Sequence, residues 1–168
     1  MAERLVVADA SPLIGLAAAD AFDLFRRLFG RITVTVAVRD EVMAGGDRPG
    51  AREIAEAIRG GWIEVAAIPV ASGRFMDLGA GEGSTLALAI ESHARCLVLM
   101  DEPLGRAHAR AHGIAVTGLA GVLLAAKRAG FISSVRHYLE RLEASNFRLS
   151  EGVIRTILEQ AGEAPETR

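Results

Sequence analysis

A chain of 168 residues is long enough for one domain with a sizeable hydrophobic core and too short for two ordinary domains. Hydrophobic residues make up 51% of the chain and charged residues 24%, a balance that excludes disorder throughout. The net charge is −2, so the average field of the molecule does not attract polyanions, and a contact with nucleic acid would need a local basic patch.

The first predicted strand carries a carboxylate to the edge of a sheet. The apolar run Leu5–Ala8 favours a strand, and Asp9 follows it directly. Proline is tolerated in the first turn of a helix, so the next helix is predicted at Pro12–Ala19. Ligands of open α/β sheets bind at the carboxyl ends of the strands, which makes Asp9 a candidate site residue.

Strand and helix patterns then alternate along the chain. Asp20 is expected to cap the second helix, and Thr117 the helix that follows the last strand. The remaining helices are predicted at Ala21–Phe29, Ala37–Ala44, Ala51–Arg59, Ser84–His93, Pro103–His112, Gly118–Ala129, Ser134–Ala144 and Glu151–Ala161. The remaining strands are predicted at Ile32–Val36, Trp62–Ile68, Cys96–Met100 and Ile114–Val116. This alternation calls for a mainly parallel sheet of four to five strands in one domain, residues 1–162, followed by a flexible tail at 163–168.

The sequence also predicts where in the cell the protein is found. Cys96 is the one cysteine, so an internal disulfide is excluded. No run approaches the roughly 18 apolar residues of a membrane-spanning helix, and Asp9 interrupts the short apolar run at the start. We therefore expect a cytoplasmic protein without membrane association.

Four carboxylates fall where predicted elements begin or end near one edge of the sheet: Asp9, Glu41, Glu82 and Asp101. Each alone would be an ordinary surface charge or helix cap. If the four converge, their repulsion raises their pKa values and favours a bound cation. Oxygen ligands with no His or Cys nearby in the sequence favour Mg²⁺ or Mn²⁺, ions that support phosphodiester cleavage.

Four longer stretches of the chain carry family-level motifs: VVADASPLIGLA at Val6–Ala17, VRDEV at Val38–Val42, GAGEGSTLALA at Gly79–Ala89, and LVLMDEPLGRAHARAHGIAVTGLAGVLLAAKRAGFI at Leu97–Ile132. They resemble the PIN-domain ribonuclease superfamily and, within it, the DUF3368 family of PIN-like proteins. The D-x-S-P-L opening and the run Gly113–Leu123 are specific in combination. The resemblance implies a three-layer α/β/α fold, an Mg²⁺- or Mn²⁺-dependent ribonuclease, an RNA substrate and a homodimer.

The resemblance also assigns site residues by position. The four acids of the family fall on the same four carboxylates, which become the catalytic and metal-binding residues. Ser11 falls on the small hydroxyl residue of the family, where it could hydrogen-bond Asp9 or a water on the metal. The family usually has a second aspartate after the fourth acid, and this chain has Glu102 there, which leaves the part of Glu102 in the site open.

Basic residues follow the last acid. Arg106 and Arg110 lie four apart on one predicted helix and so share a face, where they are candidate contacts for RNA phosphates. A solvated helix whose cations favour its dipole is the alternative. His108 and His112 also share a face, but no glutamate of an HExxH motif accompanies them, which argues against zinc.

Other functions were weighed against the nuclease. A dinucleotide loop at Gly79–Gly83 lacks a good strand before it, and a receiver domain needs an acidic pair where Ala10 follows Asp9. A catalytically silent PIN-like module that binds RNA or protein is the main alternative. The family is often encoded like the toxins of toxin–antitoxin pairs, so an antitoxin is a candidate partner, expected on exposed helices between Pro12 and Ala44.

Overall fold

In the computed structural model, which describes residues 4–67, 74–92 and 95–163, five strands form one sheet in which every pairing is parallel. The strands are β1 (Leu5–Ala8), β2 (Ile32–Thr35), β3 (Ile63–Ala66), β4 (Cys96–Leu99) and β5 (Ala115–Thr117). The helices of the described residues are α1 (Ala10–Ala18), α2 (Asp23–Phe29), α3 (Val36–Met43), α4 (Ala51–Arg59), α5 (Ala80–Glu91), α6 (Pro103–Ala111), α7 (Leu119–Arg128), α8 (Val135–Ala144) and α9 (Glu151–Gln160).

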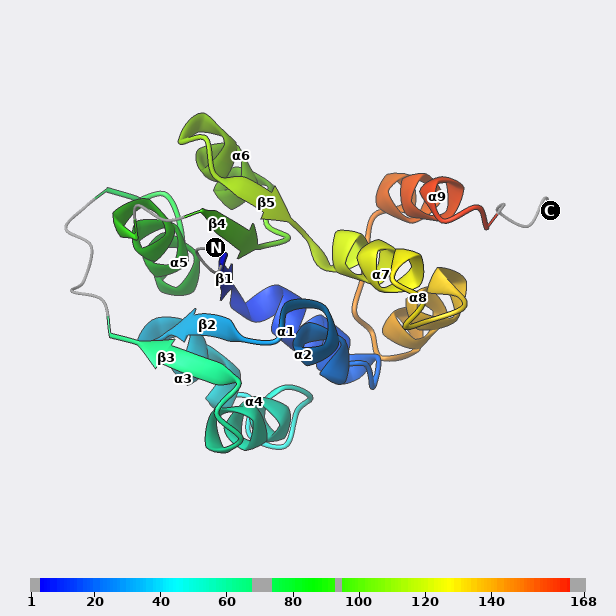
Figure 1. Cartoon of the computed structure of the whole chain (residues 1–168), viewed down its shortest axis with the longest axis horizontal. Helices are drawn as coiled ribbons and strands as arrows, with labels where there is room; N and C mark the ends of the chain where they lie inside the picture. Colours follow the sequence, from blue (N-terminus) through cyan, green and yellow to red (C-terminus); the bar gives the residue numbers. More distant parts are fainter. Residues whose placement is uncertain (1–3, 68–73, 93–94, 164–168) are drawn as a thin grey trace.

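The strand order is β3-β2-β1-β4-β5, with β1 at the centre (Figure 1). The chain builds outward from β1 to β3 and then crosses to β4 on the other side, so the order reverses between β1 and β4. This reversal is where open α/β sheets open a crevice for ligands. Ala8 pairs with Leu99 across the two strands, so Asp9 and Asp101 leave the sheet beside each other at this crevice.

Alternate residues along β4 contribute to two separate cores, because successive side chains point to opposite faces of the sheet. Val6, Ala8 and Leu99 belong to the larger core, which includes α1, α2 and α7. Val98 and Met100 belong to the smaller core, under α5 and α6. The predicted three-layer α/β/α fold with a parallel sheet is confirmed. None of the described helices combines the length and apolar character that crossing a membrane requires.

Two predicted helix caps are wrong. Asp20 has a φ of 53° and lies in the turn between α1 and α2, so α2 begins only at Asp23, with Phe22 before it. Thr117 ends β5, and the residue before α7 is Gly118. Asp and Thr are both residue types that often cap helices, but the backbone conformation decides whether the side chain can reach the N–H groups of the first turn.

Helix α5 begins earlier than predicted. It starts at Ala80, and the side chain of Glu82 accepts a hydrogen bond from the N–H of Gly79 (2.9 Å), which stabilises a first turn rich in glycine. Ile68 and His93, the predicted ends of a strand and of this helix, lie outside the described residues.

Helix α1 is largely buried, contrary to the expectation that it would offer an exposed face to an antitoxin. A Cβ atom at Gly15 would lie 2.7 Å from Cδ2 of Leu119 and 3.0 Å from Cζ of Phe147, so α1 packs closely against α7 and the segment after α8. Exposed residues in this part of the chain lie on α2 and α3 instead.

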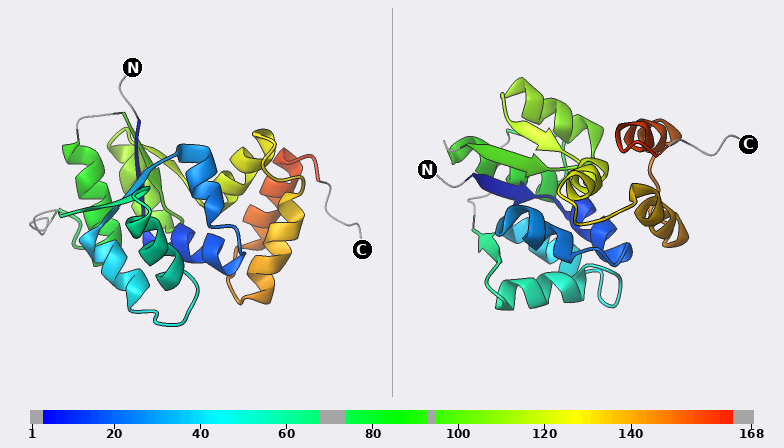
Figure 2. Two further views of the ribbon diagram at one scale, coloured as in Figure 1. Left: turned by 60° about the horizontal axis from the view of Figure 1, so that its bottom comes forward. Right: turned by 45° about the vertical axis from the view of Figure 1, so that its right-hand side comes forward.

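The last three helices group at one end of the molecule (yellow to red in Figures 1 and 2). Glu163, expected to begin the flexible tail, ties α9 to the start of α8. Its carboxylate accepts hydrogen bonds from Lys127 Nζ (2.7 Å), Ser134 Oγ (2.9 Å), Val135 N (2.6 Å) and Arg136 N (2.9 Å). Partial burial opposes ionisation, but these donors outweigh it and lower the pKa of Glu163 from 4.5 to about 2. The expected tail therefore excludes Glu163, and residues 164–168 lie outside the described part.

Replacing Glu163 by glutamine is expected to lower the free energy of unfolding at pH 7 by about 2 kcal/mol, because charge-assisted hydrogen bonds are lost. Since folding lowers the pKa of Glu163, its contribution in the parent is complete above pH 4.5 and disappears as the pH falls toward 2. Urea unfolding at several pH values measures both effects. Glu159→Gln, an exposed change on α9, is the matched control, and equal stability of the two variants would contradict the prediction.

Candidate functional site

Asp9 lies at the end of the central strand, at the start of α1, and is only 3% exposed. Its Oδ1 atom has no hydrogen-bond partner among the described residues. Burial raises the pKa of Asp9 from 3.8 to about 7, against a lowering by the N–H of Ala10. Negative charge on the three other candidate acids raises this pKa further: Glu82, Glu41 and Asp101. The electrostatics of Asp9 therefore depend on all three.

Gly81 of α5 faces two of these acids at once. A Cβ atom at this position would lie 2.7 Å from Oε2 of Glu41 and 3.3 Å from Oδ1 of Asp9. Both carboxylate oxygens thus lie within a few ångströms of the same point on α5. Glycine leaves this space open, and any other residue would place a methyl group or more between the acids.

Glu41 and Glu82 lie on the two helices that meet at this edge, α3 and α5. Burial raises the pKa of Glu41, and the charge of Glu82 raises it further. One oxygen of Glu82 accepts a hydrogen bond from the N–H of Gly79 and so caps the start of α5. Glu82 therefore has a structural role as well as a place beside Glu41 and Asp9.

Asp101 is held by groups of its own. Its Oδ1 accepts a hydrogen bond from the N–H of Leu119 (2.8 Å), the first residue of α7, and its Oδ2 accepts one from Ser11 Oγ (3.4 Å). Burial raises the pKa of Asp101, while the Leu119 N–H, the charge of Arg106 and the Ser11 hydroxyl lower it. The carboxylate is thus fixed in position between β4 and α7.

The three other acids act on Asp9 electrostatically without forming a closed cage around it. Among the described residues, no group of three or more His, Cys, Asp or Glu side chains lies close enough together to hold a metal ion. The donor chemistry nevertheless suits a cation, because a buried carboxylate oxygen without a partner is costly to keep charged.

Ser11 and Glu102 are the two residues whose roles were open. The Ser11 hydroxyl donates to Asp101, whereas Asp9 or a water on the metal was the expected partner. Glu102 accepts a hydrogen bond from the N–H of Gly105 (2.7 Å) and so caps α6. This bond occupies Glu102 at the start of a helix, next to the acids rather than among them.

Arg106 and Arg110 line one open groove of about 760 Å³, as their shared helix face predicts. Ser11 and Asp101 lie in the same groove, whose opposite wall is α9 with the connector from α8. Burial and the nearby charge of Arg110 lower the pKa of Arg106, while Asp101 raises it. Arg106 also donates to the carbonyl oxygen of Met100 (3.1 Å). We call this cavity the arginine groove; its charged lining residues in the described chain are Asp101, Arg106, Arg110 and Arg148.

Two hydroxyl residues that the sequence did not single out hold α5 over Asp9. Ser84 Oγ donates to the carbonyl oxygen of Gly81 (2.9 Å) and lies 2.7 Å from Thr35 Oγ1. Because the Ser84 proton is used at Gly81, Thr35 is the donor between the two hydroxyls, and Thr35 accepts from the N–H of Val38 (3.2 Å). A hydroxyl residue at the end of a β-branched strand was the one available signal.

The histidines of α6 have partners of their own. His108 Nε2 lies 2.8 Å from Asp77 Oδ2, and the rings of His108 and His112 both contact the edge of Phe75. Through Phe75, the two histidines pack on the smaller core.

The geometry can be compared with known proteins. A search of the curated proteins found no match. A family model described as "DUF3368: PIN domain" matches residues 5–163. The matched segment runs from the first residue of β1 to Glu163 and contains the whole sheet, the four acids and both walls of the arginine groove. The chain therefore belongs to the DUF3368 family of PIN domains.

Proposed function

We propose that the protein is an endoribonuclease that hydrolyses RNA phosphodiester bonds at the acids around Asp9, with Mg²⁺ or Mn²⁺ as cofactor. PIN domains are generally nucleases, which supports the reaction class. A groove with three arginines beside the acids supports a polyanionic substrate. The choice of RNA follows the resemblance to PIN-domain ribonucleases.

One observation carries this proposal: the buried Oδ1 of Asp9 without a hydrogen-bond partner. Among the described residues, one other buried side-chain atom also lacks a hydrogen-bond partner, the hydroxyl oxygen of Thr85. A carboxylate is far costlier to bury unpaired than a hydroxyl, and three further acids face Asp9. Such an arrangement loses stability without a cation and gains from binding one.

The donor set fits a hard divalent ion. Mg²⁺ is usually held through one or two carboxylates and keeps several waters, so it needs no closed group of protein ligands. A bound ion would lower the pKa of a water molecule and stabilise charge on the leaving oxygen.

The side chains would divide the remaining work. Asp9 and Asp101 would hold the ion, with Asp101 oriented by Ser11 and the N–H of Leu119. Glu41 and Glu82 would complete the metal site on the side of α3 and α5.

Metal dependence tests the proposal. Purified protein is incubated with labelled RNA in Mg²⁺, in Mn²⁺ and in EDTA. We expect cleavage with either ion, a rate at least about 100-fold lower in EDTA, and recovery when the metal is restored, because the ion supplies several kcal/mol of transition-state stabilisation. Equal cleavage in EDTA would contradict the metal mechanism. RNA binding without cleavage under any of these conditions would instead favour the catalytically silent module.

We also propose, from the resemblance, a toxin role in the cytoplasm, regulation by an antitoxin and assembly as a homodimer. Since α1 is buried, an antitoxin on this part of the chain would contact the outer faces of α2 and α3, where Met43 is 43% exposed. Purification from the native host followed by mass spectrometry would identify such a partner.

A further inference from the structure

We propose that the arginine groove binds the single-stranded segment of the RNA next to the scissile phosphate, and that Arg148, from the connector between α8 and α9, binds its phosphates together with Arg106 and Arg110. This inference rests on the proposed function, because it extends the same site along the substrate strand. It assigns a role to a residue far from the acids in sequence.

Apart from Asp101, the charged side chains that line the groove are all positive. Among the described residues that line it, Asp101 is the only acid, and it accepts a hydrogen bond from Ser11, another lining residue. Arg106 and Arg110 contribute positive charge from α6, and Arg148 contributes it from the opposite wall. A strand that leaves Asp101 along the groove therefore passes between cations on both sides.

Two of these cations lack anionic partners in the described chain, whereas Arg106 lies near the charge of Asp101. Arg110 and Arg148 are exposed and take part in none of its ion pairs. Arg110 lies close enough to Arg106 to disfavour the charge of that guanidinium. Cations gathered without counter-charges favour a polyanionic ligand, which exchanges its condensed counterions for them.

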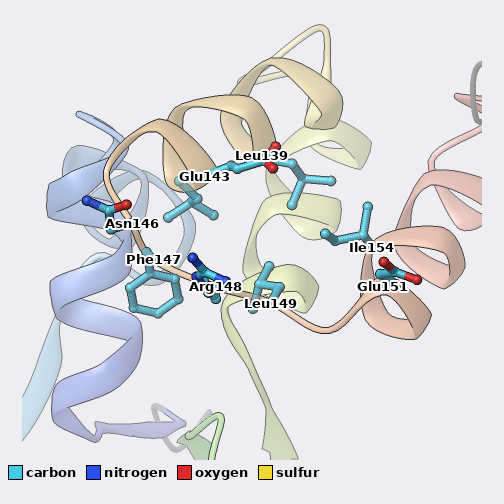
Figure 3. A pocket seen from close by; sticks show the side chains of 9 residues that line it. Leu139, Glu143, Asn146, Phe147, Arg148, Leu149, Glu151 and Ile154 are labelled. Carbon is cyan, nitrogen blue, oxygen red and sulfur yellow. The ribbon is translucent and has the colours of Figure 1, made fainter.

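The wall that carries Arg148 is anchored on both sides of this residue. Phe147 packs against Gly15 of α1, and Leu149 packs against the larger core. Figure 3 shows the connector entering α9 beside a second, smaller pocket of about 330 Å³ between α8 and α9, with Arg148 between the two flanking apolar side chains. Glu163 ties the far end of α9 to α8. A fixed wall binds with a smaller loss of conformational entropy than a mobile loop.

The size of the groove favours one strand over two. A cavity of about 760 Å³ is in the range of small-ligand sites, roughly 300–1,000 Å³. A few nucleotides of a single strand fill such a space, which is too small to enclose a double helix. Basic grooves that follow the backbone of one strand are the usual means of binding single-stranded nucleic acid.

Binding measured without cleavage tests this inference. Fluorescence anisotropy with a short labelled single-stranded RNA in EDTA, on the Asp9→Asn background, reports affinity alone. Arg148→Gln is expected to weaken binding about 3- to 10-fold at low salt and to reduce the slope of log affinity against log salt by about 0.7, the value for one phosphate contact of a single strand. Arg148→Lys is expected to keep most of the affinity. Arg155→Gln, on an exposed part of α9 outside the groove, is the matched control and should change neither quantity.

A second variant tests for a gain of binding, which misfolding of the protein could not produce. Thr156→Lys adds a cation to the α9 wall of the groove and is expected to tighten binding and steepen the salt dependence. Equal affinities for Arg148→Gln and Arg155→Gln would overturn the inference, as would better binding of an RNA duplex. Displacement of the RNA by polyglutamate of equal charge at the same concentration would overturn it in favour of an acidic protein segment.

The outcome also separates this inference from the proposed function. Metal-dependent cleavage with no effect of Arg148→Gln would leave the nuclease standing and remove the groove assignment. Loss of RNA affinity in Arg148→Gln, with no cleavage by the parent in either metal, would support the groove and remove the nuclease.

Discussion

Replacing Asp9 by asparagine is expected to lower the rate of RNA cleavage by at least about 1,000-fold, which corresponds to about 4 kcal/mol of transition-state stabilisation. The amide keeps the shape of the side chain but removes the charge that would hold the metal ion. The charges of the other three acids all act on Asp9, so this change also alters the electrostatics of the whole group. Single-turnover cleavage of labelled RNA in Mg²⁺ measures the effect.

Two comparisons make the result specific to the site. Asp40→Asn, beside Glu41 on α3, changes a 61% exposed carboxylate that pairs with Arg39, and it should cleave at the parental rate. Gly81→Ala keeps all four acids but places a methyl group against Glu41 and Asp9, and we expect a loss of about 100-fold through misplacement of the carboxylates. Parental activity in Asp9→Asn would remove Asp9 from the mechanism.

Without metal, the parent should lose stability as the pH rises from about 4 to 7, and Asp9→Asn should lose less, because the raised pKa values of Glu41 and Asp101 remain in the variant. Folding raises the pKa of Asp9 from 3.8 to about 7, so the folded protein holds its proton more tightly than the unfolded chain. The stabilisation from protonated Asp9 is complete below pH 3.8 and is lost progressively up to pH 7, a change of up to about 4 kcal/mol.

Above pH 7 the asparagine variant should therefore be the more stable protein in EDTA. We expect a gain of about 2 kcal/mol, smaller than the full shift because the buried amide also lacks a complete set of partners. Urea unfolding in EDTA at several pH values measures the gain, and saturating Mg²⁺ should reverse the order by stabilising only the parent. A parent that stays equally stable from pH 4 to 8 in EDTA would show that Asp9 ionises without strain. The stabilisation by Glu163 is lost below pH 4.5, and the stabilisation by protonated Asp9 is lost at higher pH. The free energy of unfolding of the parent should therefore be greatest near pH 4 to 5.

The sheet and two of the acids could be predicted because they depend on local sequence. Short apolar runs that end on Asp9 and Asp101 specify strand tips, and parallel strands bring such tips to one edge. The approach of Glu41 and Glu82 to this edge is a tertiary matter. It depends on the close packing of α3 and α5 at Gly81, and the sequence indicated it only through the positions of the two acids near the ends of predicted elements and through the family resemblance.

The features that the sequence did not predict also depend on tertiary structure. Asp20 and Thr117 carry the right side chains for caps, but their backbone positions were set by the turn after α1 and the end of β5. The hydroxyls of Thr35 and Ser84 meet across elements that are far apart in the chain. Arg148 could not be linked to the acids because the groove exists only once α8 and α9 pack on α7.

The parts that would perform chemistry and the parts that would choose the substrate come from different regions of this chain. The acids belong to the sheet and the helices beside it, while one wall of the groove is the C-terminal segment fastened by Glu163. Exchange of that segment between relatives could then redirect an unchanged hydrolytic centre to new RNA targets. Evolution would have a separate module on which to act, and diversification of specificity would not endanger the reaction itself.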